Sequence, residues 1–194
     1  MNSKRIIVGF SGASGAIYGL RALEMLRAAG VETHVVASRS AELTLRDELD
    51  IGIRDLEPLC DQLHAIGNVG ATIASGSFPA DGMMITPCSV RTLSEIVTGV
   101  TSTLLTRAAD VTLKERRPLL LMVRETPLHL GHLRSMMAAA EMGAIIAPPV
   151  PAFYAKPDTL DEMVSFTVGR ALDQFGIKAP IQRWAGLGKS TPPE

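Results

Sequence analysis

Short apolar runs rich in β-branched residues alternate along this chain with longer amphipathic stretches, and this alternation limits the possible folds more than any other feature. The runs span residues 6–10, 33–37, 82–86, 119–123 and 144–147. Between them apolar residues recur at helical spacing, as in the stretch that ends at Gly30. Strands separated by helices favour βαβ units, whose strands form a parallel sheet covered by helices. We therefore predict an α/β fold, a doubly wound, mostly parallel sheet in a Rossmann-like or flavodoxin-like three-layer sandwich.

One domain accounts for the length and composition. With 194 residues, 46% of them hydrophobic, the chain is long enough to bury one core, which we assign to residues 1–184, followed by a disordered tail over 185–194. The formal net charge of -1 indicates no nucleic-acid partner. Cys60 and Cys88 provide neither a disulfide framework nor a zinc spacing, and no apolar run reaches the roughly 18 residues of a membrane span. These features favour a cytoplasmic protein without a metal or a membrane span.

The ligand of a doubly wound sheet binds beyond the carboxyl ends of the strands, so the loops after the predicted strands carry the candidate site. The first loop, 11–15, contains glycines that let the backbone approach a phosphate at the start of a helix. Its spacing is not the G-x-G-x-x-G of dinucleotide sites, and the second strand ends in Ser38-Arg39 instead of an acid. NAD is therefore disfavoured, NADP stays open through Arg39, and a tight turn without a ligand is the alternative interpretation.

The loop after the third predicted strand offers hydroxyl groups. Ser89 is placed to cap the next helix, and Ser89 and Thr92 are equally able to hydrogen-bond the ring or the ribityl group of a flavin. Cys88 lies at the strand end, where a free thiol usually packs as a small apolar group, so we assign it no catalytic role.

The loop after the fourth predicted strand is charged. Arg124 and Glu125 directly follow a fully apolar strand, and burying either would be costly without a ligand or partner. The other candidates for a cationic phosphate pocket are Arg107, Lys114, Tyr154 and Arg170. Solvated or ion-paired surface groups are the alternative interpretation of these basic residues.

Five longer segments carry a family resemblance. They are 11–19 (SGASGAIYG), 85–89 (ITPCS), 107–118 (RAADVTLKERRP), 124–129 (RETPLH) and 148–154 (PPVPAFY). In this order, within a match from about residue 4 to residue 184, they resemble the UbiX-like flavin prenyltransferases. Trp184 is similar to a carboxyl-terminal tryptophan of that family. No aromatic residue occurs at 67–77, where some members have a tryptophan before the segment equivalent to Ala74-Ser75-Gly76.

This resemblance implies a Rossmann-like subunit in a homo-oligomer, a dodecamer, with active sites between subunits. It implies an enzyme that joins the dimethylallyl group of dimethylallyl phosphate to N5 and C6 of reduced FMN and releases phosphate, without a metal. The product, prenylated FMN, would then serve as cofactor of a UbiD-type decarboxylase.

The resemblance also implies roles for individual residues. The residues matched to FMN binding are Gly12, Ala13, Ser14, Ser38, Ser89, Val90, Arg91, Thr92 and Arg124. The residues matched to the prenyl phosphate and its surroundings are Arg107, Lys114, Tyr154 and Arg170. The residues assigned to catalysis are Ser14, Glu48, Glu125 and Lys114.

Loss of an allylic phosphate builds negative charge on the leaving oxygen, and the chain lacks the D-D-x-x-D motif that would hold magnesium there. The predicted stabilisers of this charge are Lys114, Arg124, Arg170 and the Tyr154 hydroxyl. Ring closure at C6 requires loss of a proton, which Glu125, Glu48 or the departing phosphate would accept.

Two other functions remain open. An FMN-dependent cysteine decarboxylase has a related fold and needs a catalytic histidine, whereas a histidine on a packed element is usually structural. The histidines of this chain are His34, His64, His129 and His132. A flavin carrier without chemistry would not need a second phosphate pocket. The mass of the product distinguishes all three functions.

Overall fold

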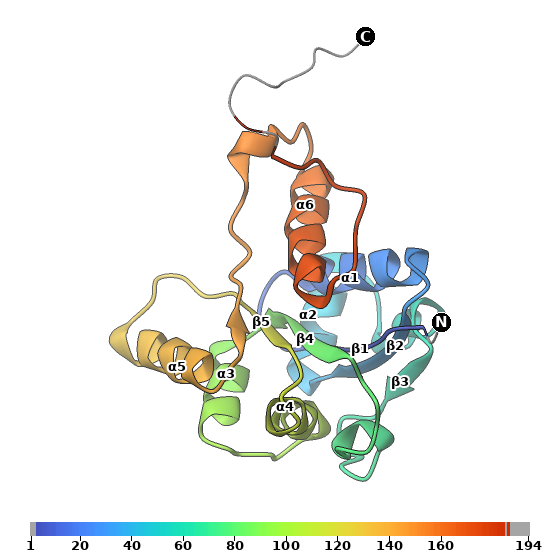
Figure 1. Ribbon diagram of the computed structural model, residues 1–194, viewed down its shortest axis with the longest axis vertical. Helices are drawn as coiled ribbons and strands as arrows, with labels where there is room; N and C mark the ends of the chain where they lie inside the picture. The colour runs from blue at the N-terminus through green and yellow to red at the C-terminus, as the bar shows by residue number, and fades with distance from the viewer. Residues whose placement is uncertain (1–2, 185, 187–194) are drawn as a thin grey trace.

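A six-stranded parallel sheet forms the centre of the computed structural model, which describes residues 3–184 and 186 (Figure 1). The strands are β1 (Arg5–Phe10), β2 (Glu32–Ala37), β3 (Gln62–His64), β4 (Gly82–Cys88), β5 (Leu119–Val123) and β6 (Ile145–Ile146). Their order is β3-β2-β1-β4-β5-β6, and every neighbouring pair is parallel. This is the strand order of a Rossmann-type sheet, and the predicted α/β fold is confirmed.

Helices cover both faces of this sheet (Figure 1). The helices on one face are α1 (Ala16–Ala28), α2 (Arg39–Leu49) and α6 (Leu160–Leu172). Those on the other face are α3 (Val90–Val97), α4 (Leu104–Lys114) and α5 (Leu130–Glu141). Short 3-10 turns occupy η1 (Ile53–Leu59), η2 (Thr72–Ala74), η3 (Phe153–Ala155) and η4 (Asp173–Phe175).

Alternate residues of β1 enter two separate cores. Ile6, Val8 and Phe10 pack under α1 and α6, while Ile7 packs with the core of α3 and α4. A parallel strand covered on both faces needs apolar residues on both sides. This explains why the runs in the sequence are continuous instead of alternating.

The prediction of five strands missed β3. This strand has three residues, lies at the edge of the sheet and pairs only with β2. Its outer residues, Gln62 and His64, are polar, so its local pattern contains no apolar run. The fifth predicted strand, 144–147, is present as the shorter β6.

The crevice of the fold opens between β1 and β4, where the strand order reverses. The buried Ser11 hydroxyl donates to the carbonyl oxygen of Pro87 at 2.7 Å and accepts from the backbone N–H of Ser89 at 2.7 Å. Ser11 therefore ties the loop after β1 to the loop after β4.

Two features concern the outer limits of the chain. In residues 3–184 and 186, no helix combines the length and the apolar character needed to cross a bilayer. The predicted tail lies almost wholly outside the described residues, so the domain boundary at residue 184 stays a prediction.

A chain of polar contacts crosses the strands β1, β2 and β3. Arg5 Nη2 lies 2.6 Å from Glu32 Oε2, Glu32 Oε1 lies 3.0 Å from His34 Nε2, and His34 Nδ1 lies 2.9 Å from His64 Nε2. The hydrogen bonds from Arg5 and then His34 lower the pKa of Glu32 to about 2. Ionised Glu32 therefore stabilises the fold above its unfolded-state pKa of roughly 4.3, and this contribution disappears as the pH falls toward 2.

Glu32→Gln is expected to flatten the dependence of Tm on pH between about pH 5 and pH 2.5, because the amide does not titrate. Thermal unfolding followed by circular dichroism across this range measures the effect. Glu141→Gln, which changes an exposed carboxylate at the end of α5, is the matched control and should keep the wild-type slope. Equal slopes for Glu32→Gln and wild type would contradict the assignment.

Candidate functional site

A cavity of about 540 Å³ lies beyond the carboxyl ends of the central strands. Of the residues predicted to bind FMN, those that line it are Gly12, Ser38, Ser89, Arg91 and Thr92. Arg39, which the sequence offered only as a contact for NADP, also lines it. The lining residues that the sequence did not reveal are Ser40, Ile66, Gly67, Glu95, Ser102, Thr103, Leu105 and Thr106. The loop after β1 and the loop after β4 thus meet at one site, as the parallel fold predicts.

Three helices begin at the wall of this cavity, each with a hydroxyl cap. Ser38 accepts from Ala41 N at 3.1 Å in α2, and Ser89 accepts from Thr92 N at 3.2 Å in α3. Thr103 accepts from Thr106 N at 3.4 Å in α4. Helix N-termini carry partial positive charge and free N–H donors, so their convergence favours an anionic ligand such as a phosphate. The capping interpretation of Ser89 is confirmed, and the same residue lines the cavity.

Gly12 brings the loop after β1 directly against α2. A Cβ atom at Gly12 would overlap the Cβ of Ser40 and lie 3.2 Å from the Ser40 carbonyl carbon. Gly15 precedes α1 with a φ of 102°, a left-handed conformation that favours glycine. Gly12 is therefore required because the loop lies so close to α2, whereas Gly15 is required because of its backbone conformation.

Glu48 of α2 holds the N-terminus of α1. Its carboxylate accepts from Gly15 N at 2.9 and 3.1 Å and from Ala16 N at 2.8 Å. Burial acts to raise the pKa of Glu48, but hydrogen bonds from Ser14, Ala16 and Gly15 and the charge of Arg124 outweigh it and hold the pKa below its usual value. Glu48 is therefore an ionised acceptor that joins Ser14 and Arg124 in one cluster.

Glu48→Ala is expected to lower Tm by about 2–4 °C, since losing an N-cap acceptor costs about 1 kcal/mol in a domain of this size. Differential scanning calorimetry measures the shift. Asp47→Ala removes the neighbouring exposed carboxylate of the same helix and should change Tm by less than about 1 °C. Equal Tm shifts for the two variants would show that Glu48 does not stabilise the N-terminus of α1.

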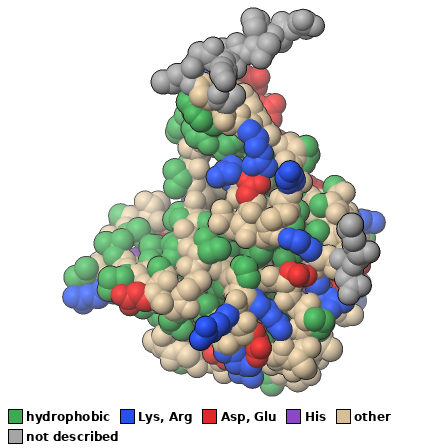
Figure 2. Space-filling model, in the orientation of Figure 1, with side chains coloured by type: hydrophobic (Ala, Val, Ile, Leu, Met, Phe, Trp, Pro, Cys, Tyr) green, Lys and Arg blue, Asp and Glu red, His purple; other side chains and the backbone are tan. Residues whose placement is uncertain are grey.

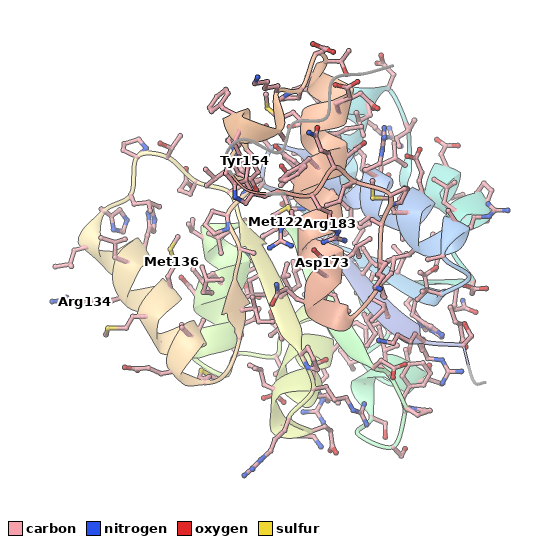
Figure 3. The ribbon with its side chains drawn as sticks, turned by 45° about the horizontal axis from the view of Figure 1, so that its top comes forward. Met122, Arg134, Met136, Tyr154, Asp173 and Arg183 are labelled. Carbon is pink, nitrogen blue, oxygen red and sulfur yellow. The ribbon has the colours of Figure 1, made fainter. Side chains whose placement is uncertain are left out.

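A second hollow, of about 630 Å³, lies between α6, β6 and the segment that follows β6. Its walls are largely apolar, with polar groups contributed by Tyr154, Thr167, Arg170 and Gln174. The ring of Tyr154 packs edge-on against Phe166, with centroids 5.7 Å apart. Figure 3 shows Tyr154 on the segment after β6, above Met122 and beside α6. Two of the predicted phosphate-binding residues, Tyr154 and Arg170, thus share one hollow.

Comparison with known proteins identifies the family. The model of the Flavoprotein family matches residues 1–172. Flavin prenyltransferase UbiX of Escherichia coli is 57% identical over 187 residues, which cover 94% of this chain and 99% of the relative. A crystal structure of AnUbiX in complex with FMN and dimethylallyl pyrophosphate matches with a TM-score of 0.94 at 45% identity, over 95% of this chain and 99% of that chain.

The chain belongs to the UbiX family of flavin prenyltransferases. The resemblance inferred from the five sequence segments is confirmed. A dodecameric FMN-dependent UbiX-like decarboxylase from Escherichia coli also matches, with a TM-score of 0.91 and 47% identity over 94% of this chain and 100% of that chain.

The other predicted UbiX-type residues are not among the residues that line the two hollows. Arg124 follows β5 at its carboxyl end, where its backbone N–H donates to Cys88 O at 3.0 Å. Lys114 ends α4 at the amino end of β5 and pairs with Glu115. The five residues of β5 span about 17 Å, so one subunit does not bring Lys114 to Arg124.

Arg107 and Glu125 have local partners. Arg107 Nη1 lies 2.8 Å from Asp110 Oδ2 one turn along α4. Exposed Glu125 accepts from the backbone N–H of Thr126 at 3.0 Å. The remaining predicted residues are Ala13, in the loop after β1, and Val90, the first residue of α3. Each is next to a residue that lines the 540 Å³ cavity, but neither lines it.

The histidines lie outside both hollows in the described part of the chain. His34 and His64 contact each other, and His129 and His132 stack at the start of α5 with centroids 3.5 Å apart. None of the four therefore lines the 540 Å³ cavity as the catalytic histidine of a cysteine decarboxylase would be expected to do.

Proposed function

We propose that this protein is a metal-independent flavin prenyltransferase. It joins the dimethylallyl group of dimethylallyl phosphate to N5 and C6 of reduced FMN, releases phosphate and supplies the prenylated FMN to a UbiD-type decarboxylase. The observation that carries the proposal is the convergence of three hydroxyl-capped helix N-termini on one cavity, and a separate hollow of the same subunit contains Tyr154 and Arg170. Membership of the UbiX family and the ligands of AnUbiX agree with this pair of sites.

The groups around the 540 Å³ cavity fit FMN. The phosphate suits the N-termini of α2, α3 and α4, and the ribityl hydroxyls suit the side chains of Ser38, Ser89 and Thr92. We assign FMN binding also to Ala13, Ser14, Val90, Arg91 and Arg124. Reduced FMN, when bound, supplies the nucleophile at N5 and the second reacting atom at C6.

The protein's own contribution is electrostatic and acid–base. Arg170 and the Tyr154 hydroxyl bind the phosphate of the prenyl donor and stabilise the charge that grows on its oxygen as the allylic bond breaks. Lys114 and Arg124 add positive charge. Glu125 accepts the proton released from C6, since its carboxylate is exposed and bound only to a neighbouring backbone N–H. Glu48 holds Ser14 and the flavin loop in place.

A second subunit would complete the site. Lys114 and Arg107 lie on α4, away from Tyr154 and Arg170 in the same chain, so we propose that they reach the phosphate from a neighbouring copy in a dodecamer. Helix α5 presents the apolar surface for such contacts, because Leu130, Leu133 and Met137 are 59%, 48% and 58% exposed. Apolar side chains cluster over this helix in the space-filling view (Figure 2).

We place the reaction in the cytoplasm. Cys60 and Cys88 are free thiols, which suits a reducing compartment, and reduced FMN requires one.

The test is anaerobic incubation of the purified protein with reduced FMN and dimethylallyl phosphate in the presence of a metal chelator, followed by mass spectrometry of the extracted flavin. We expect a flavin heavier by one five-carbon unit, formed only when both substrates are present. If the flavin stays unmodified with dimethylallyl phosphate and also with dimethylallyl pyrophosphate, prenyl transfer is refuted. A flavin carrier without chemistry would then be the remaining function. Loss of carbon dioxide from a peptidyl cysteine would instead identify a cysteine decarboxylase.

A further inference from the structure

Asp173, directly after α6, binds two arginines at once. Its Oδ2 lies 2.5 Å from Arg170 Nη1 and 2.7 Å from Arg183 Nη1, and its Oδ1 lies 2.7 Å from Arg183 Nη2. Arg183 therefore grips the carboxylate with two parallel hydrogen bonds, while Arg170 gives it only one. Figure 3 shows Arg183 beside Asp173 below Tyr154, and Figure 2 shows basic side chains gathered around acidic ones over α6.

The segment that carries Arg183 is packed along α6. Ile181 lies against Gly169, where a Cβ atom would come within 2.5 Å of the Ile181 Cγ2 atom. The next residues place Arg183 on Asp173 and the ring of Trp184 edge-on against Tyr154, with centroids 5.5 Å apart. Arg183 does not itself line the hollow, but it is held on Asp173, the partner of Arg170, and the neighbouring Trp184 contacts Tyr154.

The charge balance of this cluster sets what Arg170 can bind. Alone, Asp173 would neutralise Arg170 and compete with a phosphate for its guanidinium. With Arg183 present, two positive charges face one negative charge, and both carboxylate oxygens are engaged. Arg170 is 52% exposed and keeps its other N–H donors for a ligand in the hollow. Hydrogen bonds from Arg183 lower the pKa of Asp173, which keeps the carboxylate ionised.

We propose that Arg183 is a positioning residue for the prenyl phosphate: it occupies both carboxylate oxygens of Asp173, so that Arg170 remains available to the phosphate. This inference rests on the proposed function, which supplies the role of Arg170. It adds one residue, Arg183, from the segment that packs along α6, outside the loops at the strand ends.

The experiment compares Arg183→Ala, Arg183→Lys and the double variant R183A/D173A with wild type. Two quantities are measured, the KM for dimethylallyl phosphate in the flavin mass assay and the Kd for inorganic phosphate by titration calorimetry. Arg183→Ala should raise both the KM and the Kd by about 10-fold, because both oxygens of Asp173 are then free to bind Arg170. Arg183→Lys should recover part of this loss. The double variant should return to within about 3-fold of wild type, because no carboxylate remains to compete for Arg170.

A merely structural role predicts a different order. If Arg183 only fastened its segment, the double variant would be as weak as Arg183→Ala or weaker, and that result would overturn the inference. Unchanged KM and Kd in Arg183→Ala, or no binding of phosphate by wild type, would overturn it as well. Wild type that binds phosphate but forms no prenylated FMN would refute the proposed function, while the phosphate titrations would still decide the role of Arg183.

Discussion

Arg170→Ala is expected to raise the KM for dimethylallyl phosphate by about 10- to 100-fold and to leave the Kd for FMN unchanged. Arg170 lines the hollow of Tyr154, and its guanidinium is half exposed there. A charge-assisted hydrogen bond to a phosphate contributes roughly 1.5–3 kcal/mol, which corresponds to this range of affinity. Steady-state kinetics with the flavin mass assay gives KM, and fluorescence quenching of FMN gives Kd.

Arg46→Ala is the matched control for this experiment. Arg46 pairs with Glu42 on the exposed side of α2 and lines neither hollow. This variant should keep the wild-type KM. Loss of FMN binding in Arg170→Ala would show that Arg170 contributes to flavin binding. An unchanged KM would show that Arg170 does not bind the prenyl phosphate.

Gly12→Ala is expected to weaken FMN binding by about 100-fold and to cost about 1–3 kcal/mol of stability. The added Cβ would overlap Ser40, so the loop after β1 and the start of α2 would have to separate. Ser38, which caps α2 and lines the cavity, would move with them, and a displacement of about 1 Å is enough to disrupt a ligand site. Flavin titration and urea unfolding measure the two effects.

Gly70→Ala separates this steric effect from the general cost of replacing glycine. A Cβ at Gly70 would meet only Asn68 Oδ1 at 3.7 Å, and Gly70 is not a lining residue of the flavin cavity. We expect wild-type flavin affinity for Gly70→Ala. Flavin affinity within about 3-fold of wild type in Gly12→Ala would show that the loop after β1 does not form the cavity wall.

Local patterns were sufficient for most of the elements. The central strands are short, continuous apolar runs, and the helices that follow them repeat apolar residues with a period of about 3.6. Both patterns depend only on neighbouring residues. The edge strand β3 was missed because a short edge strand with polar ends has no such apolar pattern. The cap at Ser89 was predicted from such a local pattern. Ser38 and Thr103 cap α2 and α4 in the same way, although neither was predicted as a cap.

The sequence by itself determined the α/β class, the loops that line the candidate cavity and membership of the UbiX family, because each depends on residues close together in the chain. Only the tertiary structure decided that Ser38, Ser89 and Thr103 meet at one cavity, and that Lys114 lies at the other end of the sheet from Arg124. Only the tertiary structure likewise revealed the two arginines on Asp173. These contacts depend on strand order and on the return of the chain along α6, which are set by packing between distant segments and leave no periodic signal in the sequence.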